Sequence, residues 1–436
     1  MIGRMKRDWS PWILTGAVVG MWALMHLLLG GSFFGPSVYN TYTRQAMAWR
    51  QGLLHLPEDV PYLELAVYKG EYYVSFPPLP SLVLLPLTFI FGMDTPDNLL
   101  VKLYALSACL MIHRTLKRAG YGKTHAGLIS FLFCFASSLL PLTMNGAVWY
   151  HAQVLSFCLL VFSVCLLTED KPTLSLLCCA LSVGCRPFNA LYLIPWFFSW
   201  FSLNLQARIS FKEALRPLIP GVCLGLLVAV EMGIYNFARF GDPLEFGHNY
   251  LPEFSTQGGV QFSMDHVLKN LRTFLWGLPF DLRLDALQVN FPLSPLILFS
   301  PALTLLLTGY ILFTALFVNP GVLGDFRIKT FGFSMLLSCP ALTLMLIGGV
   351  IDLFKKRFRP EKAVVLVTCI AHAFFLLMHR TFGGYQLGAR YAVDLMPYAL
   401  FFLLLTPEKK KAHFAEYAFL VLVFALTVWG MSQMGI

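Results

Sequence analysis

The sequence predicts an all-α integral membrane protein, a polytopic helical bundle whose first external loop carries short surface helices. Three observations point to this class. Hydrophobic residues make up 57% of the chain and charged residues only 13%, whereas a soluble domain has about 25% charged residues. Apolar runs recur near the ~20 residues needed to cross a bilayer. Lysine and arginine gather in short segments between those runs, as they do in cytoplasmic loops.

The net charge of +9 is therefore interpreted as a topology signal, and no nucleic-acid partner is expected. All ten cysteines lie inside apolar stretches, and no two of them form a CxxC pair. Cysteines in this setting are typical of small apolar packing residues and do not indicate disulfides or metal ligands.

The first apolar run, from about Pro11 to Gly30, follows a basic N-terminus. It is long for the apolar part of a signal peptide and has no small-residue cleavage site after it. We interpret it as a signal anchor that leaves the N-terminus in the cytoplasm. Because this first helix then crosses the membrane once, the polar, aromatic segment 32–77 lies outside the cytoplasm. Its length favours a functional loop.

Further apolar stretches are expected at about 78–93, 97–113, 124–144, 152–168, 173–185, 188–203, 217–238, 294–318, 331–353, 363–378, 391–406 and 415–434. Basic loops mark the cytoplasmic side at Arg114–Lys123, Arg208–Arg216, Lys355–Lys362 and Lys409–Lys411. Parity requires the stretches 78–93 and 97–113 to make one net crossing together, and 294–318 to be re-entrant, interfacial or a tight hairpin. The sequence thus predicts about 10 to 13 transmembrane helices in one domain, 1–436, with external loops at about 32–77 and 240–292.

The first external loop has the clearest local pattern. Aromatic residues flank Lys69 and Gly70, which predicts a small β-hairpin with its turn at these two residues. Pro77 and Pro78 end the second strand and start a helix. Just before the hairpin lies Glu64, among apolar neighbours. A carboxylate at a membrane edge can accept a proton or hold a metal, although a solvated surface glutamate has the same sequence pattern.

Charged residues within or beside apolar segments form a second group. Arg186 lies at the expected outer end of a helical hairpin, and Glu231 lies inside a membrane stretch. Arg390 and Asp394 are four residues apart, as in an i,i+4 ion pair. Intramembrane charges usually face an interior or a water-filled cavity. For these residues the sequence leaves two interpretations open, a functional cavity and a structural ion pair. Arginine suits a phosphate ligand because its planar guanidinium binds two oxygens at once.

Aromatic and histidine side chains form a third group at three expected external helix ends. One end carries Trp149, Tyr150 and His151, another carries Tyr235 through Tyr250 with His248, and the third carries His379. Tryptophan and tyrosine are common in the interfacial belt of any membrane protein. Together, however, these ends place cationic, carboxylate and aromatic groups on one face of the membrane, which suits a substrate with a phosphate and a polar ring.

On these residues the chain resembles the GT-C class of membrane glycosyltransferases, which includes the aminoarabinose and protein O-mannosyl transferases and bacterial relatives that use polyprenyl-phosphate sugars. The resemblance is carried, in the expected order, by Glu64–Pro80, Tyr235–Gly247, Phe333–Pro340 and Gly383–Pro397. It implies a polytopic membrane enzyme whose first external loop supplies an acidic catalytic residue. That residue is usually an Asp early in the loop, but the early loop here contains Asn40, so Glu64 is the candidate by position.

The resemblance also implies basic side chains that bind the lipid phosphate near the outer leaflet. The expected substrate-binding residues are Lys69, Tyr72, His151, Arg186, Arg239, Arg390 and Tyr391. Members of the class use the acidic residue either as a general base or to bind a metal, so a divalent metal such as Mg or Mn is left open as a cofactor.

The implied function is transfer of a sugar from a polyprenyl-phosphate donor to a glycan, lipid or protein acceptor on the extracytoplasmic face of the cell membrane. A single displacement of a phosphate leaving group would invert the anomeric carbon. Two alternatives share the membrane architecture. A lipid-linked substrate transporter or flippase would need pseudo-symmetric halves, which the sequence does not display. A polysaccharide polymerase or ligase would need a later external loop with Arg and His, and Arg272, Arg283 and His266 in 240–292 keep it open.

Overall fold

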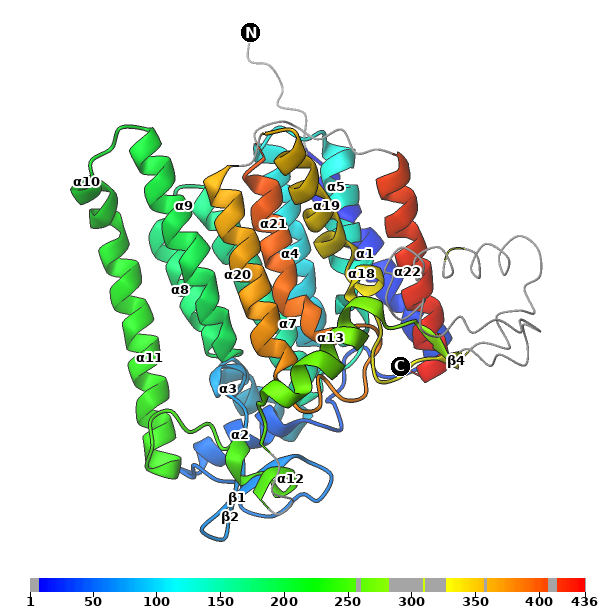
Figure 1. Cartoon of the computed structure of the whole chain (residues 1–436). Helices are drawn as coiled ribbons and strands as arrows, with labels where there is room; N and C mark the ends of the chain where they lie inside the picture. Colours follow the sequence, from blue (N-terminus) through cyan, green and yellow to red (C-terminus); the bar gives the residue numbers. More distant parts are fainter. Residues whose placement is uncertain are drawn as a thin grey trace.

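The computed structural model describes residues 8–255, 260–281, 309, 327–356, 359–406 and 414–435. Within them, six helices are long and apolar enough to cross a membrane: α1 (Ser10–Leu29), α4 (Asp97–Arg118), α7 (Val148–Thr168), α11 (Ile219–Phe240, continuous with α10), α20 (Pro360–Leu377) and α22 (Phe414–Met434). Shorter helices complete the bundle: α5 (Lys123–Phe135), α8 (Pro172–Val183), α9 (Leu193–Gln206), α19 (Pro340–Phe354) and α21 (Met396–Leu404). The chain is thus a multi-pass helical membrane protein, as predicted (Figure 1).

The remaining helices lie mostly at the ends of the bundle: α2 (Thr41–Arg50), α3 (Leu79–Phe91), α6 (Leu139–Leu142), α10 (Phe211–Leu215), α12 (Pro252–Ser255), α13 (Val267–Trp276) and α18 (Met335–Ser338). Single 3-10 turns are η1 (Gly92–Asp94), η2 (Pro187–Tyr192), η3 (Arg216–Leu218), η4 (His248–Tyr250), η5 (Met264–His266) and η6 (Arg390–Leu395). The described strands form two antiparallel pairs, β1 (Leu65–Tyr68) with β2 (Glu71–Val74), and β3 (Phe280–Asp281) with β4 (Arg327–Ile328).

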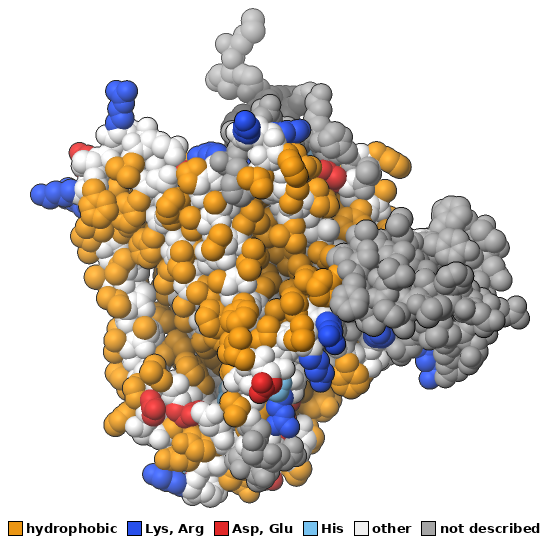
Figure 2. Space-filling model, viewed as in Figure 1, with side chains coloured by type: hydrophobic (Ala, Val, Ile, Leu, Met, Phe, Trp, Pro, Cys, Tyr) orange, Lys and Arg blue, Asp and Glu red, His pale blue; other side chains and the backbone are white. Residues whose placement is uncertain are grey.

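The two ends of the bundle differ in character. One end, here called the hairpin end, carries α2, the β1–β2 hairpin and α12; the other, the basic end, carries the turns between α4 and α5, α9 and α10, and α19 and α20 (Figure 1). Figure 2 shows an apolar band between these ends, with lysine and arginine side chains on either side of it. The predicted basic loops after α4, after α9 and after α19 share one side of the bundle, as the charge pattern requires, and Lys409–Lys411 lies outside the described residues.

One local prediction is confirmed. The β1–β2 hairpin turns at Lys69 and Gly70, both with positive φ (52° and 85°), and pairs Leu65 with Val74. The stretch 78–93 forms the short α3 at the hairpin end, beside the surface helix α2, while 97–118 forms the spanning α4 (Figure 1). The single net crossing of these two stretches stays a prediction. The expected re-entrant segment 294–318 lies outside the described residues apart from residue 309.

The core is centred on α7, which packs against α4, α8 and α21. Its side chains are buried on all sides, which is the pattern of an apolar helix surrounded by other helices. At the opposite extreme, α11 exposes Leu226, Val230 and Ile234 by 55–65%, so these side chains face lipid. Glu231 is also exposed on α11, which corrects the expectation that this intramembrane carboxylate faces an interior cavity.

Candidate functional site

Four segments far apart in the sequence meet at the hairpin end of the bundle. They are the residues that lead into β1, the start of α7, the turn between α8 and η2, and the turn from α20 into η6. Their polar side chains interact in a connected set, so the aromatic and charged groups predicted for three separate helix ends belong to one site.

Glu64 lies immediately before β1, and Trp149 in the first turn of α7 donates a hydrogen bond from Nε1 to its Oε2 at 2.9 Å. Surrounding protein atoms desolvate the carboxyl and raise its pKa above the ordinary glutamate value. The Trp149 hydrogen bond opposes that rise, Glu253 adds to it, and Arg390 opposes it. Glu64 is therefore a solvent-exposed carboxylate of increased basicity, and the indole of Trp149 holds it in place.

Arg390 is buried at the start of η6, where Gln386 Oε1 accepts a hydrogen bond from its backbone N at 2.8 Å. Its guanidinium lies over two aromatic rings, at 5.6 Å from the centroid of Tyr150 and 5.3 Å from that of Tyr391. It forms no ion pair with any described residue, and its Nε is buried without a hydrogen-bond partner. A buried cation without a counterion is costly, so this side chain is suited to receive an anion.

The expected ion pair between Arg390 and Asp394 is wrong. Asp394 Oδ2 instead accepts hydrogen bonds from Arg186 Nε at 3.0 Å and Nη2 at 2.7 Å. The physical reason is local: residues 390–395 form a 3-10 turn with three residues per turn, so positions four apart do not share a face. Asp394 therefore neutralises Arg186, and Arg390 is left without a counterion.

Gln153 on α7 fixes this arrangement. Its Nε2 donates to Asp394 Oδ1 and to the backbone O of Arg390, both at 3.0 Å. Tyr192 adds a hydrogen bond from its hydroxyl to the backbone O of Asp394 at 2.8 Å. The turn η6 is thereby held against α7 and η2, and this contact sets the direction of Arg390 and Tyr391.

Two histidines of the expected external helix ends, which were not among the expected substrate-binding residues, also lie here. The ring of His379 packs 5.6 Å from Tyr391, and that of His248 packs 5.5 Å from Phe76. Burial, followed by the charge of Arg186, lowers the pKa of His248 to about 4. Burial, followed by His248 and Arg186, lowers the pKa of His379 to about 3. Both rings are therefore neutral near pH 7 and can act as hydrogen-bonding groups.

No sequence signal links these two histidines, because they are 131 positions apart on separate segments, η4 and the turn after α20. Their position at expected external helix ends was visible in the sequence, but aromatic and histidine residues at such ends are common in the interfacial belt.

His151 is fully buried on α7, two residues after Trp149. The Tyr104 hydroxyl lies 3.5 Å from its Nε2, while its Nδ1 has no hydrogen-bond partner. The ring of Tyr42, whose buried hydroxyl also lacks a partner, packs edge-on at 6.0 Å. Two unmet polar groups thus lie close together beneath α2, and buried groups of this kind normally have partners.

Three expected substrate-binding residues lie elsewhere. Lys69 is exposed at the tip of the hairpin. Tyr72 forms a backbone bridge with Leu56, whose backbone N donates a hydrogen bond to the backbone O of Tyr72 at 2.8 Å. Arg239 at the end of α11 donates from Nη1 to the backbone O of Val74 at 2.7 Å. These contacts hold the hairpin on the bundle and do not bring the three side chains to Arg390.

A metal site was left open by the sequence. Among the described residues, no three His, Cys, Asp or Glu side chains gather where they could hold a metal ion. Glu64 has an indole and a guanidinium around it, and neither of these is a metal ligand. No chemical step is therefore derived through a metal.

An apolar cavity of about 280 Å³ opens beside η6. Its walls come from α13, α18, α19 and α20, and Leu395 of η6 closes one side. Only apolar side-chain surface lines it. The same short turn thus carries the unpaired Arg390 at its start and the wall of an apolar cavity at its end.

The comparisons with known proteins bear on the fold. No family model matches the chain, and no curated protein matches it in sequence. Among solved structures, the oligosaccharyltransferase of Archaeoglobus fulgidus in its apo form is similar over 99% of this chain, with a TM-score of 0.50 and 13% identity. The archaeal oligosaccharyltransferase AglB from the same organism, in complex with an inhibitory peptide and a dolichol-phosphate, aligns over 98% with a TM-score of 0.49 and 13% identity.

The chain spans about half the length of these solved structures, covering 56% of each. At such low identity the likeness concerns architecture, and it extends over nearly the whole of this chain. The resemblance to the GT-C class is confirmed at that level: this chain has the membrane fold of a GT-C oligosaccharyltransferase.

Proposed function

We propose that this protein is an inverting membrane glycosyltransferase that moves a sugar from a polyprenyl-phosphate donor to an acceptor on the extracytoplasmic face. The observation that carries the proposal is an arrangement at the hairpin end: Arg390, which is buried and forms no ion pair with any described residue, lies over the ring of Tyr150, and the adjacent Trp149 donates a hydrogen bond to Glu64. An anion site beside a general base is what displacement of a phosphate leaving group requires.

The proposed reaction is a single displacement. The acceptor hydroxyl attacks the anomeric carbon while Glu64 removes its proton. The bond from the anomeric carbon to the phosphate oxygen breaks, and its electron pair leaves with polyprenyl phosphate. Arg390 stabilises the charge that builds on the leaving phosphate, and Tyr391 packs beneath its guanidinium. Because attack and departure occur on opposite faces, the anomeric carbon inverts.

The other side chains have supporting roles in this proposal. Arg186, neutralised by Asp394, orients η6 and keeps part of its guanidinium at the site, 5.1 Å from the ring of Tyr391. His151 and the neutral His379 supply hydrogen bonds to the sugar. Arg239, Lys69 and Tyr72 hold or terminate the hairpin that positions Glu64.

The apolar cavity beside η6 is the proposed place of the donor's isoprenoid tail. Its wall is free of polar surface and includes Leu395, the last residue of the turn η6 that Arg390 begins. Each buried CH₂ contributes about 0.8 kcal/mol, so even a few isoprene units supply substantial binding energy. The donor phosphate would then lie at the junction between the apolar cavity and the guanidinium.

The orientation in this proposal follows the positive-inside rule. The basic end, where the lysine- and arginine-rich turns after α4, α9 and α19 lie and where α1 begins at Ser10, faces the cytoplasm in this orientation (Figure 1). The hairpin end and Glu64 then face the extracytoplasmic side, where a cell-envelope glycan, lipid or protein is the acceptor. A cysteine-accessibility test from each side of sealed vesicles checks this orientation.

The decisive experiment incubates purified protein with a panel of polyprenyl-phosphate sugars and acceptors and measures release of polyprenyl phosphate. Wild type should release it, and Glu64→Gln and Arg390→Ala should each lower the rate at least 100-fold. Lys69→Ala, which changes an exposed charge in the same loop, should stay within twofold. Release that persists in Glu64→Gln would remove the assignment of the base, and absence of release from every donor would overturn the donor class.

A further inference from the structure

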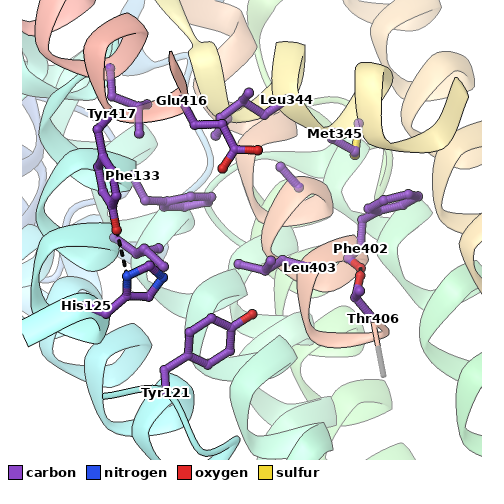
Figure 3. A pocket seen from close by; sticks show the side chains of 14 residues that line it. Tyr121, His125, Phe133, Leu344, Met345, Phe402, Leu403, Thr406, Glu416 and Tyr417 are labelled. Carbon is purple, nitrogen blue, oxygen red and sulfur yellow. Dashed lines mark hydrogen bonds between the residues drawn. The ribbon is translucent and has the colours of Figure 1, made fainter. Parts of the chain in front are cut away.

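A second cavity lies at the basic end of the bundle, far from the hairpin end. It is bounded by α5, α19, α21 and α22 and has a volume of about 120 Å³ (Figure 3). That is the space of roughly four water molecules at ~30 Å³ each, enough for a small polar headgroup. Nothing in the proposed transfer reaction uses this cavity.

The rim of the cavity is polar. Glu416, in the first turn of α22, directs its carboxylate into the cavity (Figure 3). It forms no hydrogen bond or ion pair with any described residue. On the facing helix α5, His125 Nδ1 lies 2.8 Å from the Tyr417 hydroxyl, and its Nε2 is buried without a partner. The rim therefore combines a carboxylate that has no ion-pair partner among the described residues with an imidazole nitrogen whose hydrogen-bonding capacity is unmet within them.

The floor of the cavity is apolar. Leu420 of α22 packs with Leu132 and Ala136 of α5, and Leu344 of α19 packs against this cluster. Phe133 and Phe402 also line the cavity. A polar rim at the start of two helices, with an apolar floor deeper between them, matches the polarity gradient of a lipid from headgroup to chain.

We propose that this cavity binds the headgroup of an aminophospholipid. Its primary ammonium donates hydrogen bonds to the Glu416 carboxylate, and a phosphate oxygen accepts from His125 Nε2 when Tyr417 donates to Nδ1. The first methylenes of the chains then cover the floor. A primary ammonium fits better than a quaternary one because only the former has N–H groups to donate to the carboxylate.

Location and charge support this occupant over a soluble metabolite. Both α5 and α22 begin at the basic end, beside Lys123 and the turn after α4, where headgroups of the adjacent leaflet lie. Lys123, which begins α5, is a cation near the lipid phosphate in this proposal, while the Glu416 carboxylate inside the cavity suits the amine.

The test measures lipid retained by the purified full-length protein. Protein is reconstituted in nanodiscs of equal phosphatidylethanolamine and phosphatidylcholine, extracted into detergent, and analysed by native mass spectrometry. Wild type should retain phosphatidylethanolamine in preference to phosphatidylcholine. Glu416→Gln should lower that preference roughly tenfold, because a hydrogen bond to a charged group is lost. Glu58→Gln, an exposed carboxylate at the hairpin end, is the matched control and should keep the preference.

A second variant guards against misfolding of the first. Ala341→Phe on α19 fills the cavity without changing a charge, and it should also abolish the preference while gel filtration shows a monodisperse protein. Equal retention of both lipids by wild type, or an unchanged preference in both variants, would overturn the proposal. The readout is lipid binding, so the result is independent of whether sugar transfer is ever observed.

Discussion

Replacing Asp394 should destabilise the protein more than replacing Arg390. Asp394 is 2% exposed and accepts two hydrogen bonds from Arg186 and one from Gln153. Asp394→Ala leaves the Arg186 charge without its partner, and breaking a buried pair in this way costs about 3–5 kcal/mol. Because Arg186 is one-quarter exposed, we expect a value near 3 kcal/mol. Arg390→Ala removes only ring contacts and should cost about 1–2 kcal/mol.

A double-mutant cycle separates the two possible partners of Asp394. Reversible unfolding in mixed micelles, followed by tryptophan fluorescence at increasing SDS fraction, gives the free energy of each variant. The coupling between Asp394 and Arg186 should be about 1.5–3 kcal/mol, and that between Asp394 and Arg390 below about 0.5 kcal/mol. An equal or larger coupling to Arg390 would restore the i,i+4 pair and refute the unpaired cation on which the proposed phosphate site rests.

Two further predictions concern Glu64 and the hairpin that carries it. A general base must be ionised, so activity should be present above the Glu64 pKa and lost as pH falls through it. The pKa of Glu64 is raised. The acid limb of the pH–rate profile should therefore lie above the ordinary glutamate value of about 4.3. Arg239→Ala removes the hydrogen bonds to Val74 and Asn236 and should lower the free energy of unfolding by about 2–3 kcal/mol. The hairpin should then be proteolysed faster, and activity should fall. Arg239→Lys should restore part of the protease resistance and part of the activity.

The sequence predicted those parts of the fold that depend on local chemistry. A membrane helix is visible from its length and apolarity alone, and the hairpin is visible because Lys69 and Gly70 lie between two aromatic runs. The stretch 78–93 forms the short helix α3 beside α2, and 97–118 forms the long helix α4; the single net crossing of these two stretches stays a prediction.

The parts that could not be predicted depend on contacts between distant segments. Asp394 and Arg186 are 208 positions apart, and the spacing of Arg390 and Asp394 fits an α-helix so well that the 3-10 turn was not foreseen. His248 and His379 lie on separate segments 131 positions apart, and no period in the sequence links them. For the same reason the sequence could not separate Arg239, which holds a hairpin, from Arg390, which faces the site.

The contrast between the two arginines of the site leads to a last prediction. The buried carboxylate of Asp394 forms an ion pair with Arg186, and this ion pair fixes η6. Arg390, on the same turn, has no counterion among the described residues. An arrangement made for stability alone would replace the unpaired guanidinium with an apolar side chain of similar length, since such replacements are often neutral or stabilising. Arg390→Met should therefore keep or raise the melting temperature in detergent while transfer is lost. A fall of several degrees would instead mean that Arg390 serves the fold, and the anion site would have to be sought at Arg186.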